Sequence, residues 1–156
     1  MTEFTIRRAE PAHASGLMAL LRKFHDEVAA VDLPPVDDGV LLTKITQQLV
    51  AGRVYICISD KRLVGSLALA VDQFWWSGTP YIGDVWFYVL PKYRSYAVFR
   101  AFVAEAEAFQ AEIIGDQPHL VPIMFGTMTG EDVDRKAKLY QRVGFKPAGG
   151  LFVKGI

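Results

Sequence analysis

Apolar side chains recur along the chain with two different periods. A two-residue alternation in residues 4–7 predicts a strand, and apolar positions three and four residues apart in residues 11–28 predict a helix with one buried face. The apolar stripe of that helix consists of Leu17, Leu20, Leu21, Phe24 and Val28. The adjacent Pro34 and Pro35 cannot continue a helix, so we expect a break before the next one.

The same patterns continue along the whole chain in the order β-α-α-β-β-β-α-β-α-β. Helices are also predicted at 38–50, 96–114 and 129–143, and strands at 53–59, 63–72, 81–90, 120–127 and 151–154. A short turn of Asp60, Lys61 and Arg62 joins two of these strands into a hairpin. No linker or repeat interrupts the order, so we expect residues 1–156 to form a single domain of the α/β (α+β) class.

Composition and charge exclude several classes of protein. The 156 residues include 17 Lys or Arg and 17 Asp or Glu, without the basic excess expected of a nucleic-acid-binding protein. No apolar run approaches the roughly 18 residues that span a bilayer, and the N-terminus does not have the pattern of a signal peptide. We therefore expect a soluble, cytoplasmic protein with no membrane partner. The single Cys57 excludes an intrachain disulfide, and no ligand pair has metal-site spacing, so we expect no metal.

The most informative segment is 84–94. It predicts a strand that ends at Pro91, a basic turn, and a helix that begins at about Tyr96. Such a turn aims backbone N–H groups and the positive end of the helix dipole at one point, which suits an anion. An ordinary strand–loop–helix connection fits the same pattern. A second segment, 138–147, predicts a helix end capped by Gly144 before a last strand.

Together these two segments resemble the GNAT acyltransferase superfamily, which transfers an acyl group from acyl-coenzyme A to an amine. The family's V-x-P-x-x-R strand end matches Val89, Pro91 and Arg94, and its later L-Y-x-x-x-G-F matches Leu139, Tyr140, Gly144 and Phe145. The likeness to a bacterial and phage-type subgroup is carried by Asp84, the aromatic strand 86–89 and Phe152-Val153-Lys154. The resemblance covers essentially the whole chain. It implies a mixed central sheet of about six to seven strands with about four helices, in which two central strands splay apart around the pantetheine arm.

The resemblance also implies acetyl-coenzyme A as co-substrate, bound at the strand end and the turn. The implied binding residues are Phe87, Val89, Arg94, Ser95, Tyr96, Ala97, Val98 and Phe99. Backbone N–H groups of the turn would meet the pyrophosphate. The turn departs from the family's R-x-x-G-x-G/A pattern, because Ala97 and Phe99 take the two small-residue positions and no glycine is present. The bulky Phe99 must turn away from a phosphate.

Three residues are candidates for the chemistry. Tyr140 stands where the family often places a tyrosine near the coenzyme sulfur, where a phenol would stabilise the departing thiolate. Asp84 is the leading candidate for the base that takes a proton from the amine, and His25 is the second. Each also fits a structural role: Tyr140 as a core ring, Asp84 as a solvent-facing acid at a strand entrance, and His25 as a partly exposed helix residue.

The two-residue period of a strand predicts the surroundings of Asp84. One face of the strand would carry Val85, Phe87 and Val89, and the other would carry Asp84, Trp86 and Tyr88. An acid beside two aromatic rings is expected to have a raised pKa.

Three consecutive aromatic residues, Phe74, Trp75 and Trp76, cannot all face the core. At least one ring should line a pocket, an interface or the surface, and an aromatic-amine pocket and a homodimer contact are equally open. Two functions remain for the chain. Tyr140 and Asp84 favour an N-acyltransferase in which a small-molecule or peptide amine attacks directly in a ternary complex. The glycine-free turn favours a binding module of the same fold without turnover.

Overall fold

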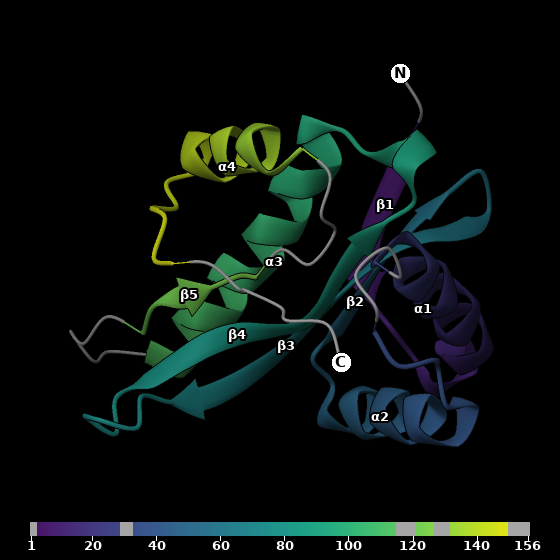
Figure 1. The fold of residues 1–156 in the computed structure, drawn as a ribbon, viewed down its shortest axis with the longest axis horizontal. Helices are drawn as coiled ribbons and strands as arrows, with labels where there is room; N and C mark the ends of the chain where they lie inside the picture. The colour runs from purple at the N-terminus through teal and green to yellow at the C-terminus, as the bar shows by residue number, and fades with distance from the viewer. Residues whose placement is uncertain (1–2, 29–32, 115–120, 127–131, 150–156) are drawn as a thin grey trace.

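A computed structural model describes residues 3–28, 33–114, 121–126 and 132–149. Its centre is one mixed sheet in the order β1-β2-β3-β4-β5 (Figure 1). The strands are β1 (Phe4–Arg8), β2 (Val54–Ser59), β3 (Arg62–Gln73), β4 (Pro80–Val89) and β5 (Ile123–Met124). Neighbours from β1 to β4 are antiparallel, whereas β4 and β5 are parallel. The predicted class and mixed sheet are confirmed, with five strands among the described residues; the predicted strand 151–154 lies outside them.

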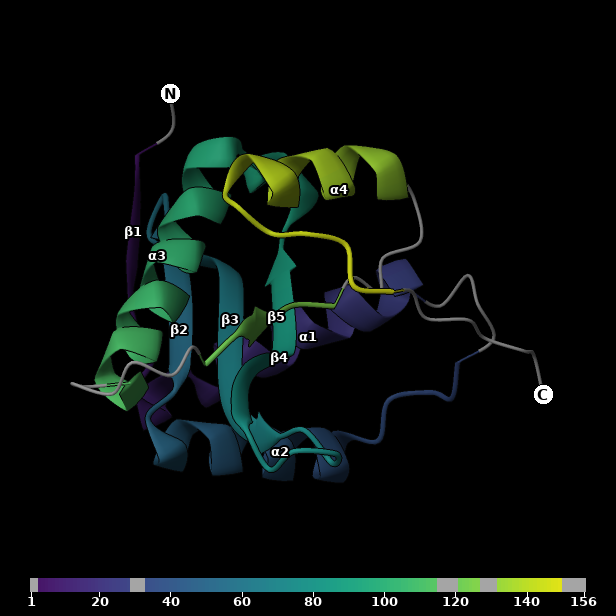
Figure 2. The same cartoon turned by 90° about the vertical axis from the view of Figure 1, so that its left-hand side faces the viewer.

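Helices cover both faces of this sheet, as two views at right angles show (Figures 1 and 2). On one face lie α1 (Ala14–Val28) and α2 (Asp38–Ala51), and on the other lies α3 (Tyr96–Ile114), with α4 (Val133–Arg142) beside it. Short 3-10 turns, Pro11–His13 and Pro91–Tyr93, precede α1 and α3. The predicted bounds of α3 are confirmed, whereas β5 is much shorter than the strand predicted at 120–127. None of the helices in the described ranges is long and apolar enough to cross a membrane.

The sheet separates two apolar clusters. The cluster under α3 contains Leu67, Leu69, Ile82, Val98, Phe102 and Ala106, and the cluster under α1 and α2 contains Leu17, Ile45, Ile56, Ala68 and Trp86. The predicted apolar stripe of α1 supplies Leu17 and Leu21 to the second cluster. Where the indole of Trp86 is buried, its N–H donates to the Ser66 hydroxyl at 3.0 Å, so the polar atom is satisfied.

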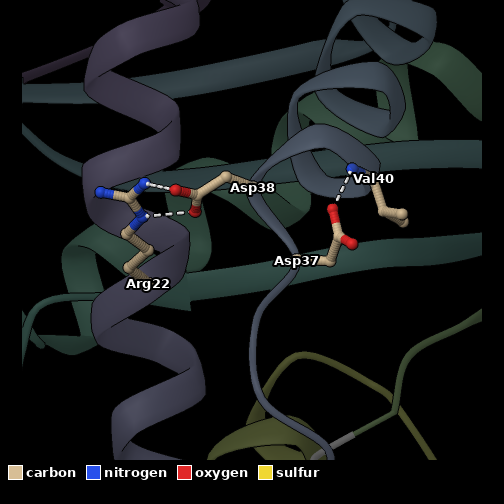
Figure 3. Close-up of polar contacts among 4 residues, drawn as sticks. All are labelled: Arg22, Asp37, Asp38 and Val40. Atoms are coloured by element: carbon tan, nitrogen blue, oxygen red, sulfur yellow. Dashed lines mark hydrogen bonds and ion pairs between the residues drawn. The ribbon is translucent and has the colours of Figure 1, made fainter.

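The polar start of α2 fixes it next to α1 (Figure 3). The Asp37 carboxylate accepts the N–H of Val40 at 3.0 Å, which satisfies one of the free donors at the helix N-terminus. Asp38, the first residue of α2, forms an ion pair with Arg22 on α1. The helix break predicted at Pro34 and Pro35 is therefore followed by a helix whose first residue, Asp38, is held to α1 by this ion pair.

A β-bulge in β4 decides which side chains face the site. Ala68 pairs with Trp86, but the next residue, Leu69, pairs with Asp84, so Val85 has no partner on β3. An extra residue interrupts the alternation of faces. Val85 and Trp86 consequently both pack on the cluster under α1 and α2.

The predicted face of Asp84 is therefore wrong. Two residues before Asp84, Ile82 packs in the cluster under α3, so the strand period places the Asp84 side chain on that face as well. Phe87 also lies there, whereas Tyr88 contacts Phe24 of α1, with ring centroids 5.2 Å apart. Asp84 and Val85 have exchanged their predicted sides.

Candidate active site

The strands β4 and β5 separate after a short stretch of pairing. Their pairing consists of Ile82 with Ile123 and Gly83 with Met124, and no further pair follows among the described residues. The N–H of Leu90 donates to the Val64 carbonyl oxygen on β3, so the alternation of an antiparallel strand directs the N–H groups of Val89 and Phe87 to the opposite, open edge. An open edge of this kind can pair with the amide groups of an extended ligand.

The turn after β4 leads directly into α3. Ser95 caps the helix, because its hydroxyl accepts the N–H of Val98 at 3.2 Å. The N–H groups of Tyr96 and Ala97, at the first two helical positions, have no acceptor within the helix. They lie at the turn for which the sequence predicts anion-binding donors.

Val98 and Phe99 contribute to the core rather than to a ligand-binding surface. Both side chains are buried, and the Phe99 ring stacks on Phe87 with centroids 5.9 Å apart. It also contacts Tyr140 edge-on at 4.9 Å. The expectation that the Phe99 ring turns inward is confirmed, and only the backbone of these two residues is left for a ligand.

Arg94 ties the end of β4 to α1. Its Nε donates to the Val89 carbonyl oxygen at 2.8 Å, and its Nη2 donates to the Glu27 carboxylate at 2.7 Å. The guanidinium also lies over the Tyr88 ring, 5.4 Å from the centroid. The Arg94 hydrogen bond lowers the pKa of Glu27, whereas burial, followed by the Glu27 carboxylate, raises the pKa of Tyr88 to about 12. This contact with Glu27 is a structural role that no sequence pattern indicated.

Asp84 and Tyr140 each contact the segment Phe125-Gly126, which follows β5. The Asp84 carboxylate accepts the N–H of Gly126 at 2.8 Å, and the Tyr140 ring contacts Phe125 and Phe145 at 6.4 and 5.4 Å. Burial raises the pKa of Asp84, and the Gly126 hydrogen bond opposes this only in part. Burial also raises the pKa of Tyr140, and the charge of Asp84 raises it further. The raised pKa predicted for Asp84 is confirmed, although the aromatic rings around it differ from those expected.

His25 has a different environment. Its Nε2 lies 2.8 Å from the carbonyl oxygen of Pro34, and since a carbonyl only accepts, this nitrogen carries the proton. The ring thus ties α1 to the segment before α2, and no described contact joins it to Asp84 or Tyr140. Cys57 is fully buried, and burial raises its pKa to about 11, which leaves the thiol unreactive.

A pocket of about 470 Å³ opens at the point where β5 leaves β4. Its lining consists of Ala70, Asp72, Tyr81, Gly83, Asp84, Val85, Met124, Phe125 and Gly126. Among the described residues of this lining, the charged groups are Asp72 and Asp84, and both are acidic. Within the described ranges, no group of three or more His, Cys, Asp or Glu is arranged to hold a metal. Sequence reasoning missed Asp72, Tyr81 and Glu27, because each acquires its role from a partner distant in the chain.

The comparison with known proteins rests on structure. No family model matches the chain, and no curated protein is detectably similar to it in sequence. The aminoglycoside N-acetyltransferase AAC(6′)-Iy, solved with the bisubstrate analogue CoA-S-monomethyl-acetylneamine, aligns with a TM-score of 0.72 and 16% identity over 98% of this chain and 97% of its own. A predicted acetyltransferase from Clostridium acetobutylicum, solved with acetyl-CoA, aligns with a TM-score of 0.71 and 16% identity over 98% and 96%.

A third solved structure holds a different bisubstrate analogue. Naa50 of Arabidopsis thaliana, in complex with the bisubstrate analogue CoA-Ac-MVNAL, aligns with a TM-score of 0.60 and 14% identity over 92% of this chain and 83% of its own. These matches span nearly the whole chain. The protein therefore has the fold of the GNAT acetyltransferases.

Proposed function

We propose that the protein is an N-acyltransferase that transfers an acetyl group from acetyl-coenzyme A to an amine. The observation that carries the proposal is that Asp84 and Tyr140 both contact the segment Phe125-Gly126, beside a pocket where β4 and β5 separate. The likeness to acetyltransferases solved with coenzyme A compounds supports it. The acceptors named for two of them, an aminoglycoside and a peptide, make a small-molecule or peptide amine the acceptor class that we propose.

The residues present suit coenzyme A. The open N–H groups of Phe87 and Val89 offer hydrogen bonds to the amides of the pantetheine arm, and those of Tyr96 and Ala97 offer them to the pyrophosphate. Ser95, Val98 and Phe99 shape the start of α3 and contribute backbone alone. The turn therefore does not depend on glycine, because its bulky residue faces the core.

The acyl group moves when the amine nitrogen attacks the thioester carbonyl carbon. A C–N bond forms, the C–S bond breaks, and the electron pair of that bond leaves on sulfur as thiolate. Asp84 takes the proton that the amine loses, and its raised pKa brings it closer to the working pH of a general base. Tyr140 donates a hydrogen bond to the sulfur. Since its pKa lies above the ordinary value of about 10 and a thiol titrates near 8.5, stabilisation of the thiolate is favoured over full transfer of the phenolic proton.

The charge of Asp84 couples the two roles. While Asp84 is ionised, it raises the pKa of Tyr140 and keeps the phenol protonated. Once Asp84 has accepted the amine proton, this charge is neutralised and Tyr140 becomes a stronger hydrogen-bond donor as the thiolate departs. His25 has no place in this scheme, because its Nε2–H is engaged by Pro34.

An assay of thiol release distinguishes the proposed enzyme from the binding-module alternative. We expect coenzyme A thiol to appear only when both acetyl-coenzyme A and an amine are present, at a rate that saturates with both. Thiol detection over a panel of primary amines and peptides, with mass spectrometry of the acetylated amine, measures this directly. Stabilisation by acetyl-coenzyme A without thiol release for any amine would favour the binding module instead.

A further inference from the structure

The tip of the β3–β4 hairpin carries the largest exposed apolar side chains of the described chain, and it projects beyond the rest of the sheet (Figure 1). Trp75 is 90% exposed and Trp76 is 65% exposed. The tip is nevertheless held by two backbone hydrogen bonds. The N–H of Phe74 donates to the Thr79 carbonyl oxygen at 2.9 Å, and the N–H of Gly78 donates to the Phe74 carbonyl oxygen at 2.8 Å. The prediction that one or more of these aromatic rings lies outside the core is confirmed.

Three rings connect this tip to the pocket. Tyr81 lines the pocket, Phe74 lies 4.8 Å from Tyr81, and Trp76 lies 4.9 Å from Phe74, measured between ring centroids. We call Tyr81, Phe74 and Trp76 the aromatic strip. Trp75 contacts Trp76 edge-on and has no recorded contact with the other two rings among the described residues.

The mouth of the pocket is acidic where the aromatic strip begins. Asp72 lines the pocket, and its carboxylate oxygens accept the Gln73 N–H at 2.7 Å and the Tyr81 hydroxyl at 3.5 Å. Asp84 is the second acid of the lining, and no Lys, Arg or His of the described ranges belongs to it. The charges suit a cation, whereas the flat rings suit an apolar planar group.

Resting on the proposed function, we propose that the acceptor is a cationic amine carried on a flat apolar body. The ammonium group enters past Asp72 towards Asp84 and loses one proton to water before attack, so that Asp84 takes the second proton as the C–N bond forms, and the flat body lies on the aromatic strip. Asp72 and Trp76 then determine specificity without taking part in the reaction.

Two variants separate the charge from the flat body. Asp72→Asn keeps an oxygen that accepts the Tyr81 hydroxyl but removes the charge. We expect it to weaken the binding of every cationic amine by about fivefold, as for one partly solvated charge at about 4 Å. Trp76→Ala shortens the aromatic strip, and we expect it to weaken the binding only of amines with a flat body, by about tenfold. Trp75→Ala is the matched control at the same tip and leaves both affinities unchanged.

The probes are phenethylamine, butylamine and glucosamine, titrated calorimetrically into the full chain with free coenzyme A present. We expect phenethylamine to bind at least about tenfold more tightly than the other two, and Trp76→Ala to abolish this preference. Equal binding of the three amines, preference for glucosamine, no binding at all, or a dimer that Trp76→Ala converts to a monomer would overturn the proposal. Thiol release from butylamine without this preference would overturn it while sustaining the proposed function, so the two fail separately.

Discussion

At the scale of single residues, burial raises the pKa of both candidate groups, Asp84 and Tyr140. The Asp84 carboxylate accepts the Gly126 N–H, and the Tyr140 ring contacts Phe99, Phe125 and Phe145. In water each would titrate at its ordinary pKa, but burial disfavours both charged forms. An acid with a raised pKa and a phenol that stays neutral are the two states that acyl transfer to an amine requires.

Removing the Tyr140 hydroxyl tests the second of these states. In Tyr140→Phe the ring keeps its contacts with Phe99 and Phe145, so the fold should be preserved. We expect kcat to fall about 100-fold, because thiolate is already a fair leaving group, while coenzyme affinity stays nearly constant. Steady-state rates with a reactive amine measure this, and Tyr55→Phe, at a buried tyrosine on β2, is the control. Wild-type kcat in Tyr140→Phe would contradict a role in the reaction.

The charge of Asp84 should cost stability near neutral pH. Because the pKa of Asp84 is raised in the folded protein, its contribution to stability is full below the ordinary aspartate pKa of about 4 and is lost as pH rises through the folded value. Asp84→Asn keeps an oxygen that accepts the Gly126 N–H. We expect this variant to match the wild-type Tm near pH 4 and to exceed it at pH 7, while kcat falls at least about 100-fold.

Thermal unfolding from about pH 4 to 8 measures the difference in Tm between Asp84→Asn and the wild type. A Tm advantage that shrank with rising pH would contradict the assigned pKa shift. Retained activity in Asp84→Asn would exclude Asp84 as the base.

Motif spacing made Tyr140 and Asp84 candidates for the chemistry, since each stands in a short pattern with a chemical reason. It could not show what surrounds them. Gly126, Asp72 and Glu27 gain their roles through contacts across 42, 9 and 67 residues of chain, to Asp84, Tyr81 and Arg94 respectively. Such contacts depend on the packed fold and leave no local pattern in the sequence.

At the scale of elements, the end of β4 and the start of α3 form one unit fastened to α1. Arg94 links them, because its guanidinium donates hydrogen bonds to the Val89 carbonyl oxygen on β4 and to the Glu27 carboxylate on α1. The periodicity predicted the bounds of α3 because its pattern is long and uniform. It failed for the faces of β4, since one extra residue at Val85 reverses the alternation and a bulge has no hydrophobic signature.

Two variants separate fastening from coenzyme binding. Arg94→Ala and Glu27→Gln both remove the same half-exposed ion pair, which is worth at most about 1 kcal/mol. If Arg94 also contacts the pyrophosphate, Arg94→Ala weakens coenzyme A about tenfold, as expected for one charged hydrogen bond. Glu27→Gln should bind coenzyme A as tightly as the wild type or more tightly, because the guanidinium is released to the ligand. Calorimetric titration measures both, and equal losses of affinity would show that Arg94 acts only as a fastening.

At the scale of the whole molecule, the described part of the sheet opens where β5 leaves β4. Four strands from β1 to β4 pair along their lengths, and within the described ranges β5 pairs with β4 through two residue pairs. This parting places the open strand edge, the N-terminus of α3 and the acidic pocket side by side along β4. The order of elements predicted the fold class, whereas the place where the sheet opens follows from pairing that periodicity does not report.

A ligand that spans the open edge and the turn should stabilise the whole fold. Acetyl-coenzyme A at 100 times its dissociation constant adds about 2.7 kcal/mol to the free energy of unfolding by mass action. For a domain of this length that corresponds to a rise in Tm of roughly 5 to 10 °C. Pantetheine, which reaches only the edge, and ADP, which reaches only the turn, should each give a much smaller shift at equal concentration, because linking two weak sites raises affinity through effective concentration.

A matched pair of variants at Tyr96 tests the turn within this prediction. Tyr96→Ala removes the ring, which lies 4.0 Å from the Arg142 guanidinium, and keeps the backbone N–H. Tyr96→Pro removes the N–H as well, at the first helical position, where proline is well tolerated. We expect Tyr96→Ala to keep the Tm shift with acetyl-coenzyme A and Tyr96→Pro to lose part of it, with the shift from pantetheine unchanged in both. If neither acetyl-coenzyme A nor its fragments changed the Tm of the folded wild-type protein, the coenzyme site and the acyl-transfer function would both be excluded.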